Sequence, residues 1–378
     1  MMTQRSPRET KMPRTLRLAA ATAGAFLPIV FGASAASAET RGYVVSWFAV
    51  ATNNPDTPVN CPQQAASTNK VDAYADGNQD RRRRDTALLD GKPVPAANYP
   101  DLVTKDPGME TVVGKYAYGF DLGGSETNKF IDPETHEKVD NQLWRAIGCV
   151  PTFQYTPPAL PYSETAPWGA MIDTSPAYTI QVTGNDLSKD GPVTVTLDRT
   201  LRHLERDAAG GVRSGVTYVL DPSPRSHNVL TGEIKNGVLS IKPAFIYLVG
   251  NMPFYPQIDL QNAHMRIHSE QGGKLVGYWG GYADWHAWVY TFTARPGAGA
   301  DNIGIYWALK KMADVDPDPK TGENRKISVT WRLEALPAFF ATNADGKIVA
   351  TASDEGLGGK ILTTPATQKT ASADGVKK

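Results

Sequence analysis

The chain has 378 residues, with 39 basic and 39 acidic side chains and a formal net charge of zero. This length can bury one large hydrophobic core or two ordinary ones. The first 38 residues contain five basic residues and one acidic residue, so the remainder keeps 34 basic and 38 acidic side chains. This balance argues against nucleic acid as a partner, because phosphate binding needs a clustered basic surface.

Residues 1–38 have the pattern of a secretory signal peptide. Basic residues precede an apolar run at 18–32, and the small residues Ala36 and Ala38 mark the expected cleavage site. The apolar run is shorter than the roughly 20 residues needed to span a bilayer. We therefore expect a periplasmic or secreted protein with no integral membrane segment after cleavage.

The part from 39 to 176 is irregular and rich in proline and turn residues. Its opening segment, 42–50, predicts a strand. A short helix is predicted at 140–147, with Asp140 as N-cap and Gly148 at its end. The remainder has loop composition, so something other than regular backbone pairing must hold it in place.

A disulfide is the expected tether of these loops. Cys61 and Cys149 are the only cysteines, and an even count in an oxidising compartment predicts that they are bonded. Closing this loop would stabilise the fold by roughly 4 kcal/mol in the chain-entropy model. In the helix beside Cys149, the polar side chains of Asn141, Gln142 and Arg145 could satisfy loop carbonyls, so we interpret the segment as a clamp.

The part from 177 to 355 predicts short antiparallel strands. Alternating apolar residues mark strands at 178–184, 192–197 and 326–333, and turn signals mark three hairpins, at Asn236-Gly237, Gly272-Gly273 and Asp345-Gly346. A helix is predicted at 301–314. We expect a mainly β fold, an antiparallel sandwich or barrel and most specifically a β-sandwich or jelly roll, with a few short helices. Residues 39–355 would form one structural unit, followed by a disordered tail at 356–378.

One strand predicts a polar face. In the stretch HMRIHSE, His264, Arg266 and His268 alternate with Met265 and Ile267, so the three polar side chains would share one side of the sheet. Such a face could bind an anion, a sugar or a metal ion. The alternative is the solvent side of an amphipathic strand.

Aromatic residues are dense immediately after this strand. Trp279, Trp285 and His286 lie among glycines and other aromatic rings. Rings beside glycine can form a platform on which a sugar stacks. The alternative is a core in which strands approach closely at glycine, and the sequence does not decide which way the rings face.

An acidic turn follows the predicted helix at 301–314. Asp314, Asp316 and Asp318 stand at alternate positions, which is the beginning of an oxygen cage for calcium. The turn lacks the glycine and glutamate that complete an EF-hand. The alternative is a solvated turn, and no other cofactor is predicted.

The chain resembles a group of exported bacterial proteins of unassigned function. The resemblance rests on Cys61-Pro62, on the Asp140–Leu143 stretch leading to Gly148-Cys149, and on the late Asp-Pro-x-Thr-Gly turn at 318–322. It implies an exported protein built as a single unit, and it transfers no activity or catalytic residue.

Three functions compete at this point. The leading hypothesis is an envelope-associated, non-catalytic module that binds a small molecule or a glycan through the residues from 264 to 286. The first alternative is a secreted hydrolase acting on a polysaccharide, with Asp284 as a catalytic carboxylate. The second is a periplasmic metal-binding protein.

Overall fold

The computed structural model describes residues 38–51, 61, 86–89, 92–95, 106, 108–150, 153–154, 172–252, 255–293, 302–342 and 346–363. The described residues all belong to one compact unit. The predicted signal peptide lies almost entirely outside the described residues, so export stays a prediction. No helix among the described residues is long and apolar enough to cross a membrane.

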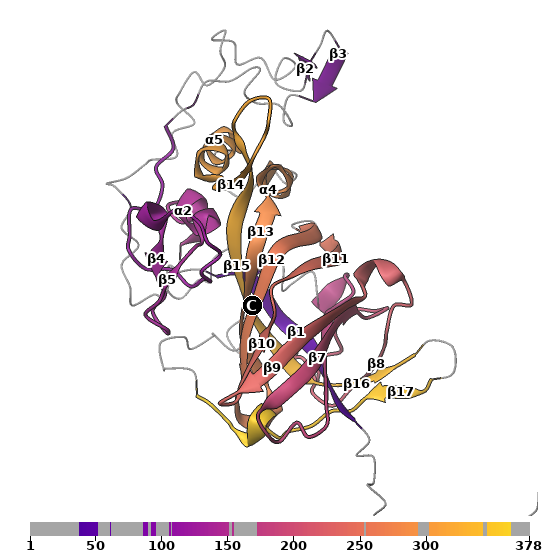
Figure 1. Ribbon diagram of the computed structural model, residues 1–378. Helices are drawn as coiled ribbons and strands as arrows, with labels where there is room; N and C mark the ends of the chain where they lie inside the picture. Colours follow the sequence, from indigo (N-terminus) through magenta and orange to yellow (C-terminus); the bar gives the residue numbers. More distant parts are fainter. Residues whose placement is uncertain are drawn as a thin grey trace, which may run out of the picture. The chain divides into compact units, whose positions relative to one another are not determined.

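Eight antiparallel strands close into a barrel-like sheet (Figure 1). Each strand pairs with the next one in the ring, and the last pairs with the first, because β1 is hydrogen-bonded to both β6 and β15. In ring order these strands are β1 (Glu39–Val50), β6 (Tyr178–Gly184), β7 (Gly191–Arg199), β9 (Asn228–Lys235), β10 (Val238–Ile241), β12 (Tyr255–Ser269), β13 (Leu275–Asp284) and β15 (Asn324–Pro337). The ring order follows the chain order, so the sheet is an up-and-down meander.

Two further strands extend this sheet outside the ring. β11 (Ala244–Met252) pairs with the first half of β12, and β14 (Val315–Pro317) pairs with β15. The predicted mainly antiparallel β fold is therefore confirmed, and the pairing gives a closed, barrel-like sheet. The narrower prediction of a sandwich or jelly roll is not confirmed by this pairing.

The remaining elements are short. Three short sheets are formed by β2 (Thr86–Leu89) with β3 (Lys92–Pro95), by β4 (Phe130–Ile131) with β5 (Lys138–Val139), and by β8 (Thr217–Val219), β16 (Phe339–Ala341) and β17 (Ile348–Ala350). The α-helices are α2 (Gln142–Ile147), α4 (Trp285–Thr293) and α5 (Asn302–Met312), and the 3-10 turns are η3 (Glu126–Asn128), η5 (Pro224–Ser226), η6 (Gln271–Gly273) and η7 (Leu357–Gly359). The sequence did not predict α4.

Helix α2 holds the loops around it, as the clamp interpretation predicts. Asn141 Nδ2 donates to Tyr118 O at 2.9 Å, and Gln142 Nε2 donates to Asn128 O at 2.8 Å. Arg145 Nη1 and Nη2 reach the carbonyls of Val112 and Asn128 at 3.0 and 2.8 Å. Side chains of one short helix thus supply the donors that irregular backbone cannot find in a ladder.

The N-cap of α2 differs from the prediction. Asn141, not Asp140, caps the helix, and its Oδ1 accepts a hydrogen bond from Trp144 N. Asp140 Oδ2 instead accepts from the backbone N–H groups of Leu122 and Gly124 at 2.9 and 3.2 Å. Asp140 therefore anchors a neighbouring loop rather than the helix, while the helix ends at Gly148 as predicted.

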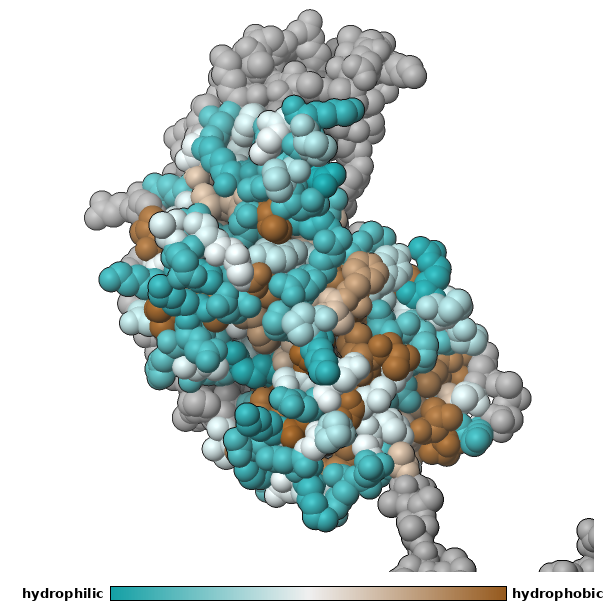
Figure 2. All heavy atoms as spheres, viewed as in Figure 1, coloured by the Kyte–Doolittle hydropathy of each residue, from teal (hydrophilic) through white to brown (hydrophobic). Residues whose placement is uncertain are grey.

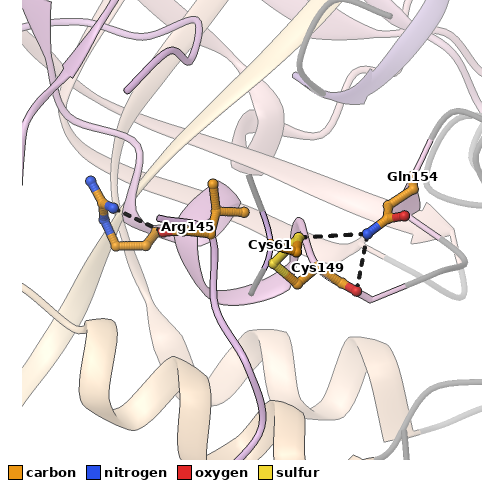
Figure 3. The surroundings of a disulfide bond; sticks show 5 residues. Cys61, Arg145, Cys149 and Gln154 are labelled. Carbon is orange, nitrogen blue, oxygen red and sulfur yellow. Dashed lines mark hydrogen bonds between the residues drawn. A yellow bond between two sulfur atoms is a disulfide. The ribbon is translucent and has the colours of Figure 1, made fainter. Parts of the chain in front are cut away.

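The disulfide between Cys61 and Cys149 is present, as predicted. Figure 3 shows it at the end of α2, where Gln154 Nε2 lies 3.7 Å from Cys61 Sγ and 3.1 Å from Cys149 O. Cys149 is buried against Trp144, Phe130 and other apolar residues. The bond ties the loop at Cys61 to the clamp.

The C-terminal segment is ordered further than predicted. Residues 346–363 are described, and Leu357 is completely buried. Leu357 N donates to Ser269 Oγ at 2.9 Å, and Leu362 N donates to Ser269 O at 2.8 Å. Residues 356–363 therefore pack against the barrel instead of forming part of a disordered tail, and 364–378 lie outside the described residues.

Candidate functional site

The predicted polar face exists on β12. His264, Arg266 and His268 are partly exposed, whereas Met265 and Ile267 are buried in the core. Successive side chains of a strand point to opposite sides of the sheet, so polar and apolar residues alternate along this half-buried strand. The polar side is the outer surface of the barrel.

The chain from 108 to 150 lies on this outer surface and neutralises Arg266. Arg266 Nη2 is 2.8 Å from Asp132 Oδ2 and 3.5 Å from Glu134 Oε2. Asp132 is completely buried. The guanidinium thus already binds two carboxylates of the protein, and an anionic ligand would have to displace them.

Tyrosine rings complete this contact. Tyr278 Oη donates to Glu134 Oε1 at 3.0 Å, and the ring of Tyr118 stacks on that of Tyr278 with centroids 4.8 Å apart. Burial raises the pKa of Tyr118 to about 12 and that of Tyr278 well above its usual value. Burial also raises the pKa of Glu134, against the opposing charge of Arg266. Both phenols stay neutral at physiological pH, and this cluster fastens 108–150 to the barrel.

The two histidines of this face are held neutral. Burial lowers the pKa of His264, whose ring stacks on Phe120 at 5.7 Å, and the charge of Asp121 only partly opposes this. Burial likewise lowers the pKa of His268. Neither imidazole supplies positive charge for an anion at neutral pH.

The structure separates the predicted aromatic residues from this face. Trp279 is opposite Met265 across β12 and β13 and points into the barrel, where it is 1% exposed. Trp285 is buried in α4, and its Nε1 donates to Asn324 O at 3.0 Å. These two rings and His264 do not line one surface, and their role in ligand binding stays a prediction.

Asp284 and His286 are exposed at the start of α4. Asp284 Oδ1 accepts a hydrogen bond from His286 N at 2.8 Å, which is the bond of a helix N-cap. The His286 ring stacks on Trp285 with centroids 3.8 Å apart. Asp284 therefore has a structural role that needs no substrate, and its catalytic role stays untested.

The three aspartates of the predicted calcium site have separate partners. Asp316 pairs with Arg325 at 2.7 Å, and Asp318 Oδ1 accepts from the backbone of its own turn. Asp314 binds Ser328. Within the described part of the chain, no group of three or more His, Cys, Asp or Glu residues is arranged to hold a metal ion. The residues present do not fit calcium.

Sequence reasoning missed an aromatic cluster inside the barrel. Phe48 on β1 lies 5.1 Å from Trp279, 5.7 Å from Trp331 and 5.8 Å from Tyr178, measured between ring centroids. These rings come from two strand pairs, β1 with β6 and β13 with β15, which meet only because β1 also pairs with β15 and closes the sheet. The alternation within each strand could have placed the rings inward, but not together.

Tyr178 Oη and Trp279 Nε1 in this cluster have no hydrogen-bond partner among the described residues. Both side chains are almost completely buried. Burial raises the pKa of Tyr178, so its hydroxyl stays protonated. Native proteins leave few buried polar groups unpaired, and each such group calls for an explanation.

Both ends of the barrel are covered. At the end where β1 begins, Arg41 shares the inward face with Tyr43 and binds Glu39 at 2.5 Å and Glu355 at 2.8 Å. At the other end, the Trp288 ring of α4 lies 5.6 Å from that of Trp331. The unpaired donors are therefore enclosed by the fold.

Side chains, instead of a backbone ladder, join β11 to β9; we call this junction the seam. β11 pairs with β12 and not with β9. Asn228 of β9 donates from Nδ2 to Tyr247 O and accepts at Oδ1 from Tyr247 N, both at 2.9 Å. Val249 N donates to Ser226 Oγ at 3.1 Å. Single side chains thus hold the edge of β11 against the barrel.

The outer surface near this seam carries exposed apolar residues. Val229 of β9 is 61% exposed and Phe245 of β11 is 55% exposed. Figure 2 shows apolar residues gathered over the lower right of the view and mostly hydrophilic ones above it. A small apolar molecule would therefore meet a compatible surface beside the seam.

Comparison with known protein families, curated proteins and solved structures finds no match for this chain.

Proposed function

We propose that this chain is an exported, non-catalytic protein that binds a small apolar molecule on its outer surface, beside the seam between β9 and β11. One observation carries the proposal: Val229 of β9 is 61% exposed and Phe245 of β11 is 55% exposed there. Fully burying an apolar side chain of this kind is favourable by roughly 1.5–3 kcal/mol, so covering these two side chains would favour binding of an apolar ligand.

The packing of the barrel supports an outer site. Eight-stranded barrels are just wide enough to be filled by side chains, and the inward side chains of Phe48, Tyr178 and Trp279 are at most 2% exposed, which leaves a ligand no room among them. The disulfide between Cys61 and Cys149 supports an oxidising, extracytoplasmic location, together with the predicted signal peptide.

The competing functions have less support. The rings of Trp279, Trp285 and Trp288 are buried, so they offer a glycan no exposed platform. Asp284 caps α4, and no metal-binding group occurs among the described residues. A small apolar ligand therefore fits better than a polymer or an ion.

Native mass spectrometry of the protein purified from its own exported fraction tests the proposal. We expect an additional small-molecule mass that is lost on denaturation, and quenching of tryptophan fluorescence when the emptied protein is titrated with the extract. A protein that is always free of ligand, and whose fluorescence and melting temperature no small molecule changes, would refute the function. Release of reducing sugar from a polysaccharide, abolished in Asp284→Ala, would establish the hydrolase instead.

A further inference from the structure

The outer surface at the seam has an apolar end and a polar end. Asn228 of β9 bonds Tyr247 of β11 across the seam, and the bonds along it run antiparallel. Val229 follows Asn228 on β9 and Phe245 precedes Tyr247 on β11, so these two exposed apolar side chains lie at one end. Arg225 precedes β9 and therefore lies at the other end.

The polar end carries an exposed positive charge. Arg225 Nη2 donates to Tyr247 Oη at 3.0 Å, and the guanidinium carbon lies 5.8 Å from the centroid of the Tyr247 ring. Arg225 is exposed, and among the described residues it has no carboxylate partner. The tyrosine holds the guanidinium at the seam without neutralising it, so the charge is available to a ligand.

The other ionisable groups near this end are compensated or out of reach. His227 Nδ1 lies 2.8 Å from Asp198 Oδ1, and Asp198 Oδ2 accepts from Gln181 Nε2 at 3.0 Å. Asp259 is opposite Tyr247 on β12, on the far side of β11 from β9. Arg225 is thus the cation at the seam to which a ligand can add a counter-charge.

The size of the apolar end favours a single small molecule over a lipid bilayer. The exposed apolar pair Val229 and Phe245 is followed on the same side of β9 by Thr231, Glu233 and Lys235, all exposed. A bilayer would have to cover these polar side chains as well, and burying an unpaired charge is costly. One short apolar chain covers the pair and leaves Glu233 in water.

We infer that the seam binds a small amphiphile that has one carboxylate and an apolar chain, with the carboxylate paired to Arg225 and the chain lying over Val229 and Phe245. Side chains two positions apart on one side of a strand are about 7 Å apart, so the chain must be several carbons long. The inference rests on the proposed function, because it assigns a ligand class to the same surface.

Three probes with the same apolar chain separate the chemistry: octanoate, 1-octanol and octylamine. Their head groups are anionic, neutral and cationic at pH 7. Titration of the full chain, followed by the NMR signals of the Val229 and Phe245 amides, should show octanoate binding about threefold more tightly than octanol, which is typical of one exposed ion pair. Octylamine should bind more weakly than either, and the preference for octanoate should shrink at high salt.

Variants then assign the preference to named side chains. Arg225→Gln should reduce octanoate affinity to that of octanol and leave octanol affinity unchanged. Lys235→Gln is the matched control, because it removes the same charge from the far end of β9 and should keep the full preference. Phe245→Ala should weaken octanoate and octanol alike by several-fold, because both lose the same apolar contact. Arg225, Lys235 and Phe245 are exposed, so these variants should fold.

The outcomes distinguish the inference from the function beneath it. If octanol or octylamine binds at least as tightly as octanoate, or if Arg225→Gln keeps the preference, the ligand class is wrong, while binding that Phe245→Ala weakens still supports an apolar ligand at the seam. Binding to anionic phospholipid vesicles without binding to octanoate would also overturn the inference, in favour of a membrane surface. If no probe binds and the native protein carries no ligand, both proposals fail.

Discussion

The carboxylate of Asp314 holds Ser328 by two hydrogen bonds, from the backbone N–H to Oδ1 at 3.0 Å and from the hydroxyl to Oδ2 at 2.7 Å. The same hydroxyl oxygen accepts a bond from Gln142 N at 2.9 Å. Asp314 follows α5, Ser328 lies on β15 and Gln142 begins α2. One partly buried carboxylate thus links the clamp helix to the barrel.

Asp314 should make the stability depend on pH. Burial raises its pKa from 3.8 to about 6, although the bonds from Ser328 oppose this. The pKa of Asp314 is higher in the folded state than in the unfolded state, so the unfolded state loses its proton at a lower pH. The free energy of unfolding therefore falls as the pH rises from about 4 to about 6. Asp314→Asn mimics the protonated form, so we expect it to add about 2 kcal/mol to the free energy of unfolding at pH 7 and little at pH 4.

Denaturant unfolding at pH 4, 5, 6 and 7 measures this difference. Asp316→Asn is the control, because Asp316 pairs with Arg325 on the surface and its φ of 64° suits asparagine. We expect a change of less than about 1 kcal/mol for this control at every pH. A constant difference between Asp314→Asn and wild type across the range would contradict the prediction.

Arg266 and Asp132 should matter to the attachment of 108–150. Asp132 is completely buried, and its carboxylate also accepts bonds from the backbone of Gly119, Glu134 and Thr135. Arg266→Met removes the cation that pairs with Asp132 and leaves the Asp132 carboxylate as a buried, unpaired charge. We therefore expect a loss of about 3 kcal/mol in unfolding free energy. Adding Asp132→Asn removes that charge and should restore part of the lost stability.

Chemical denaturation of the single and double variants checks this coupling. The matched control is Arg325→Met, since Arg325 binds Asp316 in an exposed pair and should lose less than about 1 kcal/mol. If the double variant is no more stable than Arg266→Met, the ion pair is not the reason for the loss.

Local patterns predicted most of the barrel strands, and the reason is physical. Period-two alternation and turn residues act within a few positions, so β6 is found with its observed bounds and the hairpin at Asn236-Gly237 has both residues at positive φ. The disulfide followed from the count of cysteines. None of these signals depends on distant parts of the chain.

The site was harder, because closure of the sheet is not local. Phe48 meets Trp331 only through the pairing of β1 with β15, and no short pattern records that partnership. Alternation separates the two faces of β12 but does not say which one is the inside of a barrel. The aromatic residues of α4 gave no helix signal, because aromatic residues favour strands while packing over the barrel end favours the helix.

The disulfide should stabilise the whole unit. It joins residues 88 positions apart, and removing it enlarges the unfolded ensemble. We expect the Cys61→Ser and Cys149→Ser double variant to lose roughly 4 kcal/mol in unfolding free energy. The wild-type protein, unfolded under reducing conditions, should have the same unfolding free energy as this double variant. Equal stability of oxidised and reduced protein would mean that the clamp holds these loops without the bond.

The seam between β9 and β11 should open more readily than the rest of the barrel. Asn228 alone supplies two of the bonds that hold Tyr247, so Asn228→Ala removes both without touching the backbone pairing of β10 with β12. We expect amide exchange at Tyr247 and Val249 to accelerate at least tenfold in this variant, because a loss of about 1.4 kcal/mol in local stability is a factor of ten.

Hydrogen exchange read by NMR or by mass spectrometry measures this opening. Thr231→Ala is the control, because this exposed side chain lies on the same strand. Unaltered exchange at Tyr247 and Val249 in Asn228→Ala would show that β11 is held by its pairing with β12 alone.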